Sequence, residues 1–217
     1  MLVSQHNNMK TGCHMIRFYL NRELSANLGI RLSRWKRWSR EFLPPDPLGG
    51  LQSGFARQYS LQEAFYVYLG GHLVADLKIS IPEAIAVLGD LKEWVTSRYF
   101  SYALPEEPSL VKQSVKEYRI YIFLNPEPEK TAHTHAYMVH RIIDQERSHG
   151  KGARIVTERY IENWLSQGET VVGSEKPEDL SRWLTARILY ITKIYQVFTA
   201  RISEKHQVSR KVSLRGP

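Results

Sequence analysis

The sequence predicts an α+β fold in which short helices come first, β-strands follow, and a long amphipathic helix lies near the C-terminus. Apolar residues at helical spacing begin with Leu20, Leu24 and Leu28 and recur as far as Trp94. Residues 118–157 are instead rich in β-branched and aromatic side chains, which is typical of strands. The chain of 217 residues is long enough to form two domains.

Composition and charge limit the class of protein. Hydrophobic residues make up 42% of the chain and charged residues 24%, as in soluble globular proteins, and no apolar run is long enough to span a membrane. The N-terminus lacks the apolar stretch of a secretory signal, and the single cysteine, Cys13, excludes an intrachain disulfide framework, so we expect a cytoplasmic location. The net charge of +8 indicates a polyanionic partner, and anionic lipid, RNA and DNA all remain open.

Changes in composition divide the chain into segments. We expect a flexible leader (1–14), a helical domain (15–95), a proline-bearing linker (96–116), an α+β domain of unknown role (117–177), an amphipathic helix (178–205) and a basic disordered tail (206–217).

Two short helices joined by a glycine form the candidate functional site. The first spans 20–30, with Asn21 as its N-cap and Gly29 at its end, and the second spans 31–42. The apolar face of the second helix carries Leu32, Trp35, Trp38 and Phe42. Its opposite face is basic and carries Arg31, Arg34, Lys36, Arg37 and Arg40. Two helices joined in this way are typical of a helix-turn-helix.

A hairpin and two further helices follow. Three prolines near Pro44 end the second helix, glycine pairs within 49–54 indicate a loop, and residues 55–59 predict its return strand. Ser60 is the predicted N-cap of a third helix, in which Gly70 and Gly71 indicate close packing or a kink. The fourth helix opens with a capping box formed by Ser80 and Glu83, and its inner face carries Ile85, Leu88, Leu91 and Trp94.

The second half of the chain predicts strands over 118–124, 137–143, 153–157 and 170–172, with a turn at 150–152 and a helix over 158–167. A final helix spans 178–205 and has apolar residues at heptad spacing. We predict that this seam joins two copies in a homodimer through Leu184, Ile188, Ile191, Tyr195, Phe198 and Ile202.

Four motifs in order carry a resemblance to a known family. Residues 23–30 (Glu-Leu-Ser-Ala-Asn-Leu-Gly-Ile) resemble an E-L-A-x-x-x-G-V first helix, and residues 34–38 (Arg-Trp-Lys-Arg-Trp) fall where that family has T-L-R-Y-Y. Residues 57–60 match R-x-Y-S, and residues 79–85 match G-L-S-L-x-E-I. Residues 15–95 therefore resemble the winged-helix DNA-binding domain of the MerR family of bacterial transcription regulators.

The resemblance implies a sequence-specific transcription regulator that binds double-stranded DNA as a homodimer at the nucleoid, with RNA polymerase as a further partner. Lys36 and Arg37 stand at the contacting positions of the recognition helix, and the wing contacts the flanking backbone. The predicted DNA-binding residues are Arg31, Ser33, Arg34, Lys36, Arg37, Arg40, Arg57 and Tyr59. The chain departs from the family in having a longer wing, Ser39 in place of a glutamate, and no long dimerisation helix directly after the fourth helix.

Other functions remain open on the residues alone. The same N-terminal domain would suit a DNA-architectural or recombination-accessory protein, and residues 118–172 would have to hold the site of an enzyme or interaction module. No catalytic or cofactor-binding motif occurs, so we predict no enzyme activity and no cofactor. Four histidines are candidate metal ligands, but no cysteine or paired carboxylate accompanies them, so we predict no metal site at His133, His135, His140 and His149. Four strand aromatics line either a core or a pocket for an apolar effector: Tyr118, Tyr121, Phe123 and Tyr137.

Overall fold

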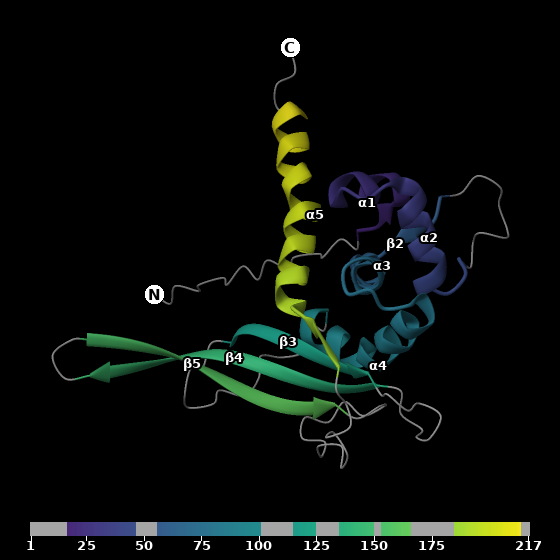
Figure 1. Cartoon of the computed structure of the whole chain (residues 1–217). Helices are drawn as coiled ribbons and strands as arrows, with labels where there is room; N and C mark the ends of the chain where they lie inside the picture. The colour runs from purple at the N-terminus through teal and green to yellow at the C-terminus, as the bar shows by residue number, and fades with distance from the viewer. Residues whose placement is uncertain are drawn as a thin grey trace, which may run out of the picture.

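A computed structural model describes residues 17–46, 56–100, 115–124, 135–149, 153–165 and 185–213. The described chain combines helices with an antiparallel sheet, in agreement with the predicted α+β class. The helices gather on one side of the four-stranded sheet, and the C-terminal helix stands upright beside the N-terminal ones (Figure 1).

Helices α1 (Asn21–Leu28) and α2 (Leu32–Phe42) are joined through Gly29, which has a left-handed conformation with φ of 68°. Only glycine adopts this conformation at little cost, so the predicted pair of helices joined by a glycine is confirmed. The prediction that Asn21 caps α1 is wrong. Leu20 is the N-cap and makes no side-chain hydrogen bond there, while Asn21 Oδ1 accepts a hydrogen bond from the Tyr59 hydroxyl at 2.6 Å.

A short sheet holds the base of the predicted hairpin. Strand β2 (Gln58–Tyr59) confirms the end of the predicted return strand, and it pairs with β1 (Tyr19–Leu20), which precedes α1. The sequence pattern assigns Leu20 to the first helix, because a two-residue strand leaves no periodic signal. The predicted loop over 49–54 lies outside the described residues.

Helix α3 (Leu61–Ala75) has the predicted N-cap, Ser60, which also forms a capping box with Glu63, and helix α4 (Ile81–Tyr99) begins with the predicted capping box. The Ser60 hydroxyl accepts a hydrogen bond from the Glu63 N–H, and Ser80 does the same for Glu83. On α4 the predicted inner residues Leu88, Leu91 and Trp94 are buried. The prediction is wrong for Ile85, which is 45% exposed because it lies in the wall of an open groove.

The main sheet contains β3 (Val115–Leu124), β4 (His135–His149), β5 (Ala153–Leu165) and β6 (Ala186–Leu189), in the order β5-β4-β3-β6. All neighbouring strands are antiparallel. The strands predicted over 118–124, 137–143 and 153–157 are confirmed. Residues 150–152, the predicted turn, and 170–172, a predicted strand, lie outside the described residues, although His149 pairs with Ala153 across the former.

The predicted helix over 158–167 is wrong, since β5 continues to Leu165 and pairs with β4 along its length. Its apolar residues fit either spacing, and the neighbouring strand decides between them by supplying a continuous ladder of hydrogen bonds. The predicted start of the last helix at 178 is also wrong, because pairing with a neighbouring strand again decides the local structure. Residues Ala186–Leu189 instead form β6 on the open edge of β3, with Leu189 opposite Ile120.

Helix α5 (Ile191–Ser213) therefore begins later than predicted and also ends later. The disordered tail predicted over 206–217 is wrong as far as Ser213, because extending an existing helix costs much less than starting one.

The predicted dimer seam is wrong where the structure describes it. Leu184 lies outside the described residues, and Ile188 belongs to β6 rather than to the helix. The remaining seam residues face the chain's own core: Ile191, Phe198 and Ile202 are buried, and Tyr195 is half-buried. The Phe198 ring packs 5.2 Å from Phe65 and 5.5 Å from Tyr68, both on α3. Their apolar surface is thus already removed from water within one chain.

One continuous core joins the helices to the sheet, across the linker expected between two domains. Trp94 of α4 packs edge-on against Tyr118 of β3, with 5.5 Å between the ring centroids. The Tyr137 hydroxyl of β4 donates a hydrogen bond to Asp90 of α4 at 2.5 Å. Helix α4 therefore lies between the sheet and helices α2 and α3, whereas the start of α5 meets β3 directly (Figure 1). Of the helices described, none is both long enough and apolar enough to cross a membrane.

Candidate nucleic-acid interface

Helix α2 is fixed by its aromatic face, as the sequence predicts. Trp35, Trp38 and Ser39 are its buried residues. The Trp35 ring packs edge-on against Tyr59 of β2, with 5.9 Å between the centroids. This contact links the helix to the short sheet of β1 and β2.

Two glycines of α3 allow α2 to approach closely. A Cβ atom on Gly70 would lie within 3.0 Å of the Phe42 ring, and one on Gly71 within 3.0 Å of the Trp38 ring. Distances this short do not occur between real carbon atoms, so the rings of α2 fill the space that side chains on α3 would need. The close packing predicted at these glycines is confirmed.

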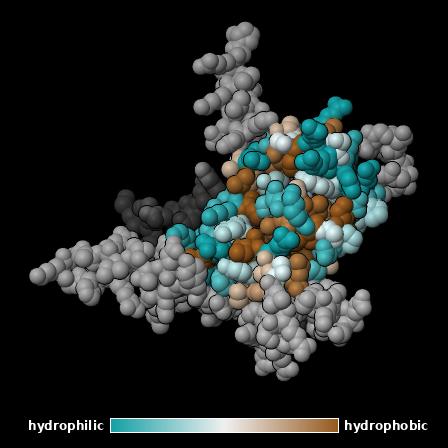
Figure 2. Space-filling model, in the orientation of Figure 1, coloured by the Kyte–Doolittle hydropathy of each residue, from teal (hydrophilic) through white to brown (hydrophobic). Residues whose placement is uncertain are grey.

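The opposite face of α2 is exposed and cationic. Each of its predicted DNA-binding residues is exposed: Arg31, Ser33, Arg34, Lys36, Arg37 and Arg40. Among the described residues, no carboxylate forms an ion pair with these five cations. Hydrophilic residues are frequent at the upper right of the face seen in Figure 2, interspersed with apolar ones, where Figure 1 places α1 and α2. The five positive charges therefore lie together in water on one helix.

The two wing residues have different surroundings. The Arg57 guanidinium lies 5.5 Å from the Tyr59 ring and donates a hydrogen bond to the Pro44 carbonyl at 2.8 Å, which connects the segment before β2 to the end of α2. Tyr59 is only 1% exposed. The prediction that Tyr59 contacts the DNA backbone is wrong, because its side chain is part of the core.

The Tyr59 hydroxyl joins three elements. It lies 2.7 Å from the Ser39 hydroxyl of α2 and donates a hydrogen bond to Asn21 of α1. Burial raises the pKa of Tyr59, while the hydrogen bond with Ser39 and the charge of Arg57 partly oppose that rise. The hydroxyl therefore stays protonated at neutral pH and holds α1, α2 and β2 in a fixed arrangement.

The C-terminal helix also holds the N-terminal pair in place. Arg201 of α5 donates a hydrogen bond to the Leu28 carbonyl at the C-terminal end of α1, at 2.9 Å. Carbonyl groups at a helix end lack partners within the helix and attract positive charge. No sequence pattern predicts this contact, because its partner is 173 residues away.

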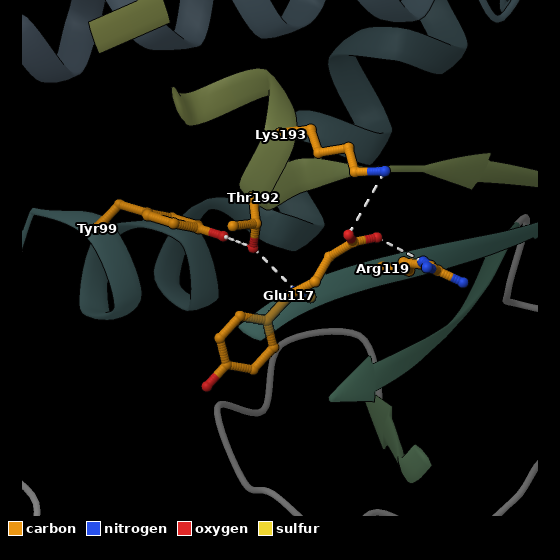
Figure 3. A network of polar contacts seen from close by, with 6 residues as sticks. Tyr99, Glu117, Arg119, Thr192 and Lys193 are labelled. Atoms are coloured by element: carbon orange, nitrogen blue, oxygen red, sulfur yellow. Dashed lines mark hydrogen bonds and ion pairs between the residues drawn. The ribbon is translucent and has the colours of Figure 1, made fainter. Parts of the chain in front are cut away.

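A second polar network fastens the start of α5 to β3 (Figure 3). Arg119 donates a hydrogen bond to the buried Glu117 carboxylate at 2.5 Å, and Lys193 lies 3.6 Å from the same group. Thr192 Oγ1 accepts a hydrogen bond from the Tyr118 N–H at 2.9 Å and lies 3.0 Å from the Tyr99 hydroxyl. The network pairs a buried carboxylate with two cations and therefore has a structural role.

The histidine and aromatic clusters are not brought together. His133 lies outside the described residues and nothing is described for the side chain of His149, while His135 and His140 stand five residues apart on β4 and so face opposite sides of the sheet. No group of metal ligands occurs among the described residues. Tyr118 and Tyr137 belong to the core, whereas Tyr121 and Phe123 alternate with the core residues Ile120 and Ile122 and lie on the other face.

Comparison of this chain with models of protein families, with characterised proteins and with solved structures finds no match.

Proposed function

We propose that this protein is a transcription regulator that binds double-stranded DNA, with α1 and α2 as a helix-turn-helix and α2 as the recognition helix. The observation that carries the proposal is the division of α2 into a buried aromatic face and an exposed face with five cations. A solvated basic face alone is common, but here the helix also packs closely against α3 and β2, and its cations form no ion pair with any described carboxylate.

The dimensions and chemistry of α2 suit the major groove. A helix with its side chains is about 10–12 Å wide, and the groove is about 12 Å wide. Lys36 and Arg37 lie mid-helix and read base edges, for which arginine has a planar pair of donors. Arg31 and Ser33 lie at the helix N-terminus and contact phosphate oxygens. Arg57 contacts the flanking backbone while it remains bonded to Pro44.

Two copies are needed to read a symmetric site. The heptad seam of α5 is not available for that purpose, since its described residues pack inside the chain. A dimer on DNA therefore forms through another surface.

The proposal is tested by removing the two central cations. Lys36→Ala with Arg37→Ala is expected to weaken operator binding at least about tenfold and to lower the salt dependence by about one to two counterions. Lys36→Ala alone has a matched control in Lys92→Ala, because Lys92 is also an exposed lysine and lies on α4; Lys92→Ala should change affinity less than about twofold. Equal losses in both variants would mean that net charge, not α2, binds DNA.

Selection of bound duplexes from a random DNA pool tests specificity. Recovery of a shared sequence supports a regulator, and a palindrome in particular supports two bound copies. Recovery of DNA without a shared sequence would instead support the DNA-architectural alternative and overturn the reading of bases by Lys36 and Arg37.

A further inference from the structure

An open groove lies between the end of α2, the start of α3 and the first half of α4. Its volume is about 510 Å³, within the range of small-molecule sites. Apolar side chains form most of its wall, among them Phe42, Leu43, Tyr66, Ile85 and Leu88. Ile85 leaves almost half of its surface in water and adds apolar area to the wall of the groove.

Gly89 of α4 has no side chain to fill the groove. Gly89 lines the groove, and a Cβ atom built on it meets no other atom within 4 Å. Gly70 and Gly71 differ, since neighbouring rings fill the space above each of them. Gly89 also costs α4 about 1 kcal/mol relative to alanine. Packing within the described chain thus gives no reason for glycine at this position, whereas a bound molecule does.

The charge on the rim favours an anion. Lys92 is exposed, lines the groove and forms no ion pair with any described residue. The other charged lining residue, Glu63, accepts hydrogen bonds from the Ser60 N–H at 2.8 Å and the Ser60 hydroxyl at 2.9 Å. Its negative charge therefore lies on the positive end of α3, and Lys92 is the cation left for a ligand.

We propose that this groove is a binding site for a small aromatic anion, with the ring system against Phe42, Tyr66 and Ile85 and the anionic group beside Lys92. The site does not depend on DNA binding. A ligand there would nevertheless touch Leu43 and Pro44, where α2 ends and where Arg57 donates its hydrogen bond.

Anilinonaphthalene sulfonate is a suitable probe, because it combines an aromatic body with one negative charge and fluoresces in apolar surroundings. We expect one probe molecule bound per chain. Gly89→Trp should fill the groove and weaken binding at least about tenfold, whereas Gly89→Ala, which adds a single methyl group to the groove floor, should weaken binding by a smaller factor. Circular dichroism of both variants checks that α4 remains folded. Ile85→Glu is a second blocking variant, at an exposed position that tolerates a charge.

The contribution of charge is measured with Lys92→Met and a neutral probe. Lys92→Met should weaken binding of the sulfonate about threefold and leave binding of the uncharged N-phenylnaphthylamine within about twofold. The proposal is overturned if neither Gly89→Trp nor Ile85→Glu weakens binding of the sulfonate, or if loss of Lys92 weakens both probes equally. It is also overturned if loss of Lys36 and Arg37 removes the bound sulfonate, since the probe would then lie on the basic face of α2.

Discussion

Helices α2 and α5 have similar amphipathic sequences and opposite roles in the fold. Each buries an aromatic and aliphatic face, and each leaves cations on its other side. The buried face of α2 contacts α3 and the short sheet, which leaves the basic face in water. The buried face of α5 packs against the same helix, α3, so it is not available to a second copy of the chain. An amphipathic pattern predicts that one face is covered, but it does not say by what.

The comparison is tested most strongly at Phe198. Phe198→Ala should lower the free energy of unfolding by about 3–5 kcal/mol, because the ring is fully buried against Phe65 and Tyr68. Val197→Ala is the control on the same helix, since Val197 is 43% exposed; it should change stability by less than about 0.5 kcal/mol. Urea unfolding measures both. If Phe198→Ala weakened self-association and left unfolding of the single chain unchanged, α5 would be a dimer helix after all.

The features that could be predicted from sequence are the ones that local chemistry determines. The capping boxes of α3 and α4 each lie within four residues, and the glycine between α1 and α2 is required by one backbone angle. The spacing of Trp35 and Trp38 predicts which face of α2 is buried, and the cations at the remaining positions are therefore predicted to be exposed. These parts of the fold and of the candidate site need no knowledge of distant residues.

The features that could not be predicted depend on distant partners. Residues 158–165 fit a helix or a strand equally, and β4 makes them a strand. Residues Ala186–Leu189 form β6 because β3 offers an open edge. The sequence predicts Tyr59 as a surface residue that contacts DNA. Its hydroxyl instead forms hydrogen bonds with Ser39 and Asn21, which lie 20 and 38 positions earlier in the chain. Ile85 matched an inner helical stripe, but no described side chain covers it, and it lines a groove instead.

A pair of glycine substitutions sharpens the contrast between a filled and an open surface. Gly71→Ala should destabilise the protein by about 1–3 kcal/mol, because the added methyl group overlaps the Trp38 ring and displaces α2 from α3. Gly89→Ala makes the same chemical change on α4, where space is open, and should stabilise the protein by up to about 1 kcal/mol. Effects of the same sign in urea unfolding would contradict the close contact between α2 and α3.

The attachment of α5 also predicts how stability responds to alkaline pH. Burial raises the pKa of Tyr99 to about 12, although its hydrogen bond with Thr192 partly opposes the rise. The folded-state pKa thus lies above that of the unfolded chain, so the stability that the protonated phenol contributes is complete below pH 10 and is lost as pH rises towards 12. At pH 11 the loss from this group is about 1 kcal/mol.

Tyr99→Phe lacks the titrating group, so its urea midpoint should fall less between pH 9 and pH 11 than that of the wild type. Parallel declines in the two proteins would mean that Tyr99 is solvated and that the start of α5 is not held against α4 as Figure 3 shows.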